Sequence, residues 1–132
     1  MKNPAAPALY PVQEASQAQA VAALRGELLA KVGNDLDIAA ELALSLHLNH
    51  REDVSALLLA IKQERWTEVR RYAHRILNTA QLLGCGALVG LCVQVEEMLA
   101  REAGQTRAEL LADYVQVVEN LSVVLERVNR TF

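Results

Sequence analysis

After Pro11 the chain contains no further proline, and only six glycines interrupt the residues that follow. Proline breaks a helix interior and glycine disfavours it, so the rest of this 132-residue chain is free to form long helices. Apolar residues then recur every three or four positions, which is the period of an amphipathic α-helix. Hydrophobic residues make up 52% of the chain but aromatic residues only 4%, so the core must consist of aliphatic side chains. These features predict an all-α protein.

The apolar pattern, which glycine interrupts at three of the four boundaries, predicts helical segments at 14–32, 35–64, 66–83, 87–103 and 106–128. Gly33 is expected to stop the first helix, and Asn34 to cap the next. The second segment is polar over residues 50–53, but it contains no Gly or Pro and is therefore expected to be one helix. The last segment opens with Thr106 and Glu109 at the spacing of a capping box.

Four long amphipathic helices joined by short loops can bury their apolar faces only against each other. We therefore expect an antiparallel up-down four-helix bundle with an additional N-terminal helix laid across it. Residues 1–13 hold every proline and show no periodicity, so they are expected to form a flexible leader. Residues 14–132 are expected to form one bundle domain.

Charge and cysteine usage exclude several classes of protein. The net charge is −3, the isoelectric point is near 5.6, and no basic run is longer than Arg70–Arg71, so nucleic-acid binding is not expected. No apolar stretch approaches the roughly 20 residues that span a bilayer, and no signal peptide is visible, so no membrane insertion is expected. Two cysteines without a CxxC motif fit a reduced, cytoplasmic setting.

The third segment carries a polar stripe opposite its apolar one. The stripe consists of Arg71, His74, Asn78 and Gln81, at spacings of three and four. We therefore expect His74 to be exposed in the middle of a helix, on a rigid scaffold. From spacing alone, the ordinary interpretation of such a residue is a solvated surface histidine.

Residues 73–85, AHRILNTAQLLGC, resemble the signature of the histidine-containing phosphotransfer (HPt) domain family. That signature runs His, any residue, Leu, Lys, Gly, a small residue, Ala, two variable positions, an apolar residue and Gly. The helices on either side are also similar to the family at Arg51 to Val54, Leu57, Ala60, Trp66, Leu88, Leu91, Cys92, Glu96 and Glu97. The resemblance covers about residues 20–103.

The resemblance implies a phosphocarrier rather than an enzyme in its own right, with His74 as the phosphoacceptor. Its partners would be the receiver domain of a response regulator and a (hybrid) sensor histidine kinase. The family brings no cofactor or metal of its own, because the Mg²⁺ ion belongs to the receiver. A solvent-exposed imidazole is mostly neutral at pH 7 and so needs no dedicated base. A monomer is expected, since it leaves the His74 face free for docking.

Residues around His74 receive roles from the same resemblance. Asn78 and Gln81 would donate hydrogen bonds to phosphoryl oxygens, and Arg71 and Arg75 would balance their charge. Leu77, together with any exposed part of Leu82, would belong to the docking surface. The chain departs from the family pattern in having Leu77 in place of the usual Lys and Asn78 in place of the usual Gly.

The Asn78 departure keeps a second function open. The missing side chain of the family's glycine lets the receiver's active site approach the histidine one turn away. The alternative is therefore an HPt-like adaptor that docks a kinase or receiver without carrying phosphate.

Two other functions have weaker support. His47, His50 and Asp53 are spaced by three and share a helix face, as metal ligands can, but the paired Glu-x-x-His motif of di-iron bundles does not occur. A solvated or partly buried polar face is the better interpretation of these residues. A thiol function would require a reactive Cys85 or Cys92; Cys92 lies on an apolar stripe, and Cys85 is expected to be the more exposed of the two.

Overall fold

The computed structural model describes residues 14–101 and 106–132, and within these ranges all regular structure is helical. The helices are α2 (Glu14–Lys31), α3 (Leu36–Lys62), α4 (Trp66–Leu82), α5 (Gly86–Arg101) and α6 (Thr106–Arg130). The all-α prediction is thus confirmed, as is the prediction that the second segment is a single helix. The leader expected at residues 1–13 lies outside the described residues.

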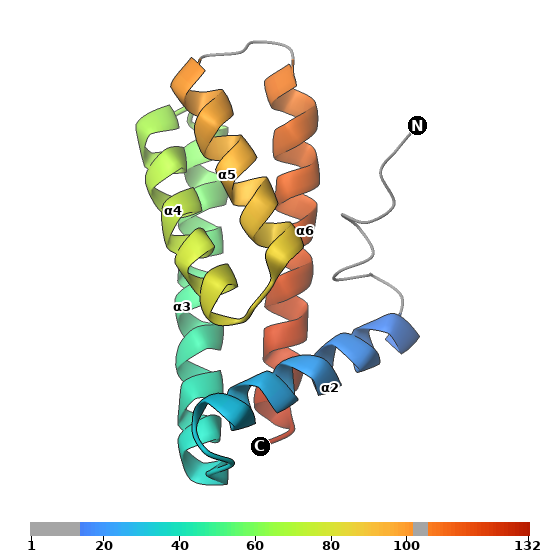
Figure 1. Cartoon of the computed structure of the whole chain (residues 1–132). Helices are drawn as coiled ribbons and strands as arrows, with labels where there is room; N and C mark the ends of the chain where they lie inside the picture. The colour runs from blue at the N-terminus through green and yellow to red at the C-terminus, as the bar shows by residue number, and fades with distance from the viewer. Residues whose placement is uncertain (1–13, 102–105) are drawn as a thin grey trace.

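The helices α3, α4, α5 and α6 form an antiparallel bundle in which each packs against the next and α6 packs back against α3 (Figure 1). α3 and α6 have 27 and 25 residues, whereas α4 and α5 have 17 and 16, so the long pair extends beyond the short pair. α2 crosses this extension and packs against both α3 and α6. The N-terminal helix therefore completes the core where α4 and α5 are too short to do so.

Three helices end in the same way, with a residue in the left-handed conformation. The next backbone N–H then donates to a carbonyl in the last helical turn, as in a Schellman motif. The donors and acceptors are Asn34 to Leu29 at 2.8 Å, Arg65 to Ala60 at 2.9 Å, and Cys85 to Ala80 at 2.9 Å. The left-handed residues that precede these donors are Gly33, Glu64 and Gly84, and at the first of the three ends Asn34 is left-handed as well. Glycine adopts this conformation without steric cost, and it occupies two of these three positions.

The start of α3 differs from the expected one by a residue. Asp35, not Asn34, is the N-cap: its Oδ1 accepts from the backbone N–H groups of Asp37 at 3.0 Å and Ile38 at 3.1 Å. Asn34 has a φ of 63°, whereas an N-cap residue requires extended backbone. Asn34 is therefore part of the tight turn that begins at Gly33, and the N-cap of α3 is the next residue, Asp35. The side chain of Thr106, expected to cap α6, lies outside the described side chains.

Side chains from every helix, most of them aliphatic, form one continuous core. Its largest fully buried member is Tyr114 of α6, and fully buried alanines of α3 and α4 let those helices approach closely. Over the described ranges, none of the helices combines the length and the apolarity needed to cross a bilayer.

Candidate functional site

His74 lies in the middle of α4 with 63% of its side chain exposed. The residues on the opposite side of α4 are fully buried: Val69, Ala73, Ile76 and Ala80. The helix phase expected from the sequence is therefore confirmed. The imidazole is held at the surface by a helix whose other face is fixed in the core.

The ring of His74 is oriented by a carboxylate of the neighbouring helix. Nδ1 of His74 lies 3.0 Å from Oε1 of Glu96 in α5. An ionised carboxylate can only accept a hydrogen bond, so Nδ1 must carry the proton and donate it. In the neutral imidazole, this places the lone pair on Nε2. The geometry thus leaves Nε2 as the ring nitrogen with a free lone pair.

Glu96 is among the residues that carry the family resemblance, but no role was expected for it. A signal for its position was nevertheless present. In two antiparallel helices joined by a short turn, residues equally distant from the turn lie side by side. Positions 74 and 96 are equidistant from Cys85, the middle of the break between α4 and α5. Counting outward from that break would have paired them.

An open hollow surrounds His74 and carries positive charge. It is lined by Thr67, Arg70, Arg71, His74, Arg75 and Glu96. Arg70 and Thr67 were not among the predicted site residues, although they lie one and two turns before His74 on the same helix face. The three arginines give the hollow a charge that favours an anion.

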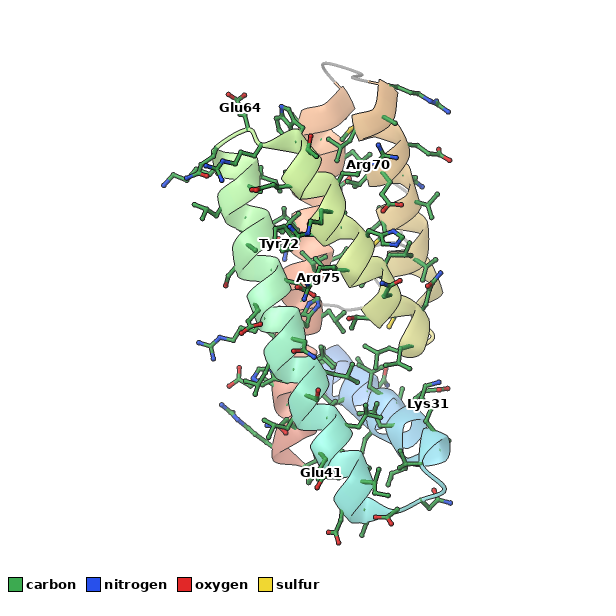
Figure 2. All side chains as sticks on the ribbon, turned by 90° about the vertical axis from the view of Figure 1, so that its left-hand side faces the viewer. Lys31, Glu41, Glu64, Arg70, Tyr72 and Arg75 are labelled. Carbon is green, nitrogen blue, oxygen red and sulfur yellow. The ribbon has the colours of Figure 1, made fainter. Side chains whose placement is uncertain are left out.

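Arg75 lines the same hollow, but its guanidinium also reaches α3. Its Nε lies 2.8 Å from Oδ1 of Asp53, a buried residue of α3. Figure 2 shows Arg75 beside α3, whereas Arg70 lies on the side of α4 that faces away from α3. Burial raises the pKa of Asp53, and the charge and hydrogen bond of Arg75 oppose that rise. Arg75 therefore already stabilises one anion, and this limits what it can offer a second.

The expected place of Leu77 in the docking surface is wrong. Leu77 is only 7% exposed and belongs to the core. The cause is that α4 packs against both α3 and α5, so its buried face is wider than the single stripe assumed from the sequence. Asn78 and Gln81 are exposed on the His74 face as expected, and so is Leu82. Neither Asn78 nor Gln81 lines the hollow.

His50 and Asp53, the polar residues in the middle of α3, face inward and not into solvent. Nε2 of the fully buried His50 lies 3.0 Å from the backbone oxygen of Val118 in α6. Burial lowers the pKa of His50, so its ring is held neutral. No group of three metal-ligating side chains forms anywhere in the described residues, so this part of the structure gives the metal alternative no site.

Both cysteines are buried, and Cys85 is the more exposed of the two, as expected, by only a small margin. Cys85 is 3% exposed because it follows the left-handed Gly84 and turns back onto the end of α4. Burial raises the pKa of Cys92 to about 11, and its Sγ lies 3.8 Å from the hydroxyl of Tyr114. A thiol with so high a pKa is almost entirely protonated at pH 7 and is a poor nucleophile.

An exposed histidine on a helical bundle, oriented by a carboxylate and flanked by arginines, agrees with the comparison with known families. The chain matches the model of the Hpt domain over residues 15–129, which is most of its length. The protein therefore belongs to the Hpt domain family, whose members are phosphocarriers in the phosphorelays of two-component systems and interact with receiver domains. Searches of curated proteins and of solved structures gave no significant match.

Proposed function

We propose that His74 accepts a phosphoryl group from the aspartate of a receiver domain and passes it to a response regulator. The observation that carries this proposal is the pairing of an exposed His74 with Glu96, which leaves Nε2 as the free nucleophile. The chain is then a phosphocarrier that transfers the group only with a partner bound. The exchange is proposed to take place in the cytoplasm, with the phosphoryl group delivered by a hybrid sensor kinase.

The proposed transfer has simple chemistry. The Nε2 lone pair attacks the phosphorus of the phospho-aspartate, the bond from phosphorus to the acyl oxygen breaks, and the aspartate leaves as a carboxylate. Because Nδ1 keeps its proton, the phosphorylated ring is cationic, and the carboxylate of Glu96 compensates that charge. The reverse reaction regenerates a neutral ring. Glu96 is therefore a positioning residue that also stabilises the charged intermediate.

The arginines of the hollow have complementary roles in this proposal. Arg70 and Arg71 flank His74 on the preceding turn, and no salt bridge engages either of them within the described residues. They are suited to attract the acidic pocket of a receiver and to contact phosphoryl oxygens. Arg75 contributes less, because its Nε is bound to Asp53. Asn78 and Gln81 would contact the receiver from the following turn.

The test uses a receiver domain labelled with radioactive phosphate on its aspartate. We expect label to appear on the wild-type protein and to be absent from His74→Gln, while both proteins keep the same helicity. His47→Gln is the matched control, because it replaces the half-buried histidine of α3 and leaves the buried ring of His50 in place. Label on His74→Gln, or no label on the wild type with any receiver, would contradict the proposal.

The adaptor alternative is favoured by one observation, the exposed Asn78 at the position where the family usually has glycine. In that case the wild type binds the receiver but takes no label. The variant Asn78→Gly then distinguishes two causes: an Asn78 side chain that blocks the approach of the receiver, and a His74 that cannot accept the phosphoryl group. If the amide side chain only slows the approach, we expect Asn78→Gly to transfer faster than the wild type.

Replacing the orienting carboxylate tests the mechanism separately. Glu96→Gln keeps a hydrogen-bond acceptor for Nδ1 but removes the charge that stabilises the cationic ring. We expect phosphotransfer to slow by roughly tenfold, as is common when a partner that orients a histidine is altered. The exposed neighbour Glu97 provides the control, since Glu97→Gln should leave the rate unchanged. Equal rates for Glu96→Gln and the wild type would remove Glu96 from the mechanism.

A further inference from the structure

The outward side of α3 is an apolar helix face that no other helix of the described structure covers. Of the nine large hydrophobic residues that are exposed among those described, six belong to α3. We define the α3 outer stripe as Leu44, Leu48, Arg51, Glu52, Ser55 and Leu59, all of which are exposed. These positions share one face of the helix because they are spaced by three and four. Figure 2 shows this side of α3 uncovered along the bundle, from Glu41 to Glu64.

The stripe lies directly opposite the core face of α3. Buried residues recur on the other side at Ala43, Leu46, His50 and Leu57. The leucines of the stripe are therefore not the edge of the core. Leu44, Leu48 and Leu59 are 46%, 48% and 54% exposed. These leucines therefore lie in solvent on the face of the helix where polar residues are usual. A contiguous exposed apolar face of this kind marks an interaction surface.

The charges of the stripe are arranged so that it is complementary to itself. Arg51 and Glu52 are adjacent at its centre, and an apolar half extends from them in each direction. Suppose that a second copy of α3 lies antiparallel on the first, with the two-fold axis between positions 51 and 52. Positions equally distant from that axis then face each other, so each Arg51 meets a Glu52 of the other copy. No salt bridge engages either residue within the described part of one chain.

The same register matches the remaining positions. It brings Leu44 of one copy against Leu59 of the other, and Leu48 against Ser55. The surface is hollowed at Ser55 and Ala56, and Leu48 and Leu59 line that hollow, so a leucine of the second copy has a place to insert. At the two ends, Glu41 faces Lys62. A parallel pair would instead place each charge against its own kind, which is unfavourable.

We propose that this protein forms an antiparallel homodimer through the α3 outer stripe. The occupant of the surface is a second copy of the chain, identified by the self-complementary charges and by a hollow at Ser55, the position that Leu48 of the second copy faces. The stripe is on α3, whereas His74 faces α5, so both candidate phosphoacceptors of the dimer stay accessible. This departs from the monomer expected from the sequence, and it does not depend on the function proposed for His74.

Sedimentation of the full chain tests the proposal, with protein from about 10 µM to about 1 mM to include a weak dimer. We expect the wild type to dimerise reversibly over this range. Arg51→Glu alone and Glu52→Arg alone each place like charges at both central contacts, and each should weaken the dimer by about tenfold or more. A mixture of the two variants should form a heterodimer, because every central contact is then attractive. The double variant should also dimerise.

Matched controls keep the test free of folding effects. Leu48→Glu should prevent dimerisation, whereas Val93→Glu, an exposed position on α5, should not. Each variant is checked for an unchanged melting temperature at a concentration where the wild type is monomeric. A wild type that stays monomeric throughout the range would overturn the proposal. This holds even if the stripe is found to bind a different protein. Failure of the mixture to restore dimers would also overturn it.

Discussion

His74 and His50 lie on neighbouring helices, and each has a carboxylate nearby, yet their surroundings are opposite. His74 is 63% exposed and donates through Nδ1 to Glu96. His50 is fully buried and bonds through Nε2 to the backbone oxygen of Val118, with Asp53 one turn away. The first ring presents a nitrogen to solvent, and the second has its Nδ1 buried without a partner in the described structure.

The difference shows that the reactivity of a histidine in this bundle depends on whether its side chain faces solvent or the core. A partner protein can reach only a surface ring, and only such a ring can change its charge without disturbing the core. The buried polar residues of α3 instead connect helices: His50 reaches α6, and Asp53 holds Arg75 of α4. One histidine is thus free for function, and the other contributes to the packing of the bundle.

The largest effect on stability is expected at the buried ring. His50→Ala leaves a cavity between α3 and α6 and should lower the free energy of unfolding by about 2–4 kcal/mol. His50→Leu fills the space and should cost less than about 1.5 kcal/mol, since the Val118 oxygen keeps a hydrogen bond from Ser122. Urea unfolding measures both. Equal stability of His50→Ala and the wild type would show that His50 does not connect the helices.

A smaller loss is expected at the link between α3 and α4. Arg75→Ala leaves the buried carboxylate of Asp53 without its partner and should destabilise the fold by about 1–3 kcal/mol, less than for a fully buried pair because Arg75 is half exposed. Arg71→Ala is the control. It removes an exposed guanidinium that lies over the ring of Tyr72 and should change the stability by no more than about 0.5 kcal/mol. Similar losses for the two variants would mean that Asp53 does not need Arg75.

The lowered pKa of His50 predicts how acid acts on the fold. Below the ordinary pKa of a histidine, the unfolded chain binds a proton that the buried ring resists, so the folded state loses stability as the pH falls from 7 towards 5. Asp53, whose pKa is raised, acts in the opposite sense. Comparing the wild type with His50→Leu at each pH isolates the histidine. We expect the wild type to lose more stability than the variant, and a constant difference would contradict this.

The smallest effect on stability is expected at the exposed ring. His74→Ala should change the free energy of unfolding by no more than about 0.5 kcal/mol, as for most surface substitutions. Thermal unfolding measured beside His50→Ala gives the comparison directly. A loss at His74 as large as that at His50 would mean that both rings are structural.

The sequence determined much of the fold because its information is local. Helix period, the absence of proline after Pro11, and the glycines at 33 and 84 fix which segments are helical and where two of them end. The phase of α4 followed from the same pattern, so the exposure of His74 was predictable. The helix end at Glu64 was also expected from the apolar pattern, although the left-handed residue there is not glycine.

Contacts between helices were decided by the tertiary structure. The burial of Leu77 depends on α4 having two neighbours, and the inward turn of His50 depends on a backbone oxygen of α6. The bond between His74 and Glu96, and the one between Arg75 and Asp53, likewise join residues of different helices. The apolar period of a helix indicates which of its residues face the core and which face water. It does not record which helix lies beside which, and that arrangement decides both which nitrogen of His74 is left without a hydrogen bond and which charges surround the ring.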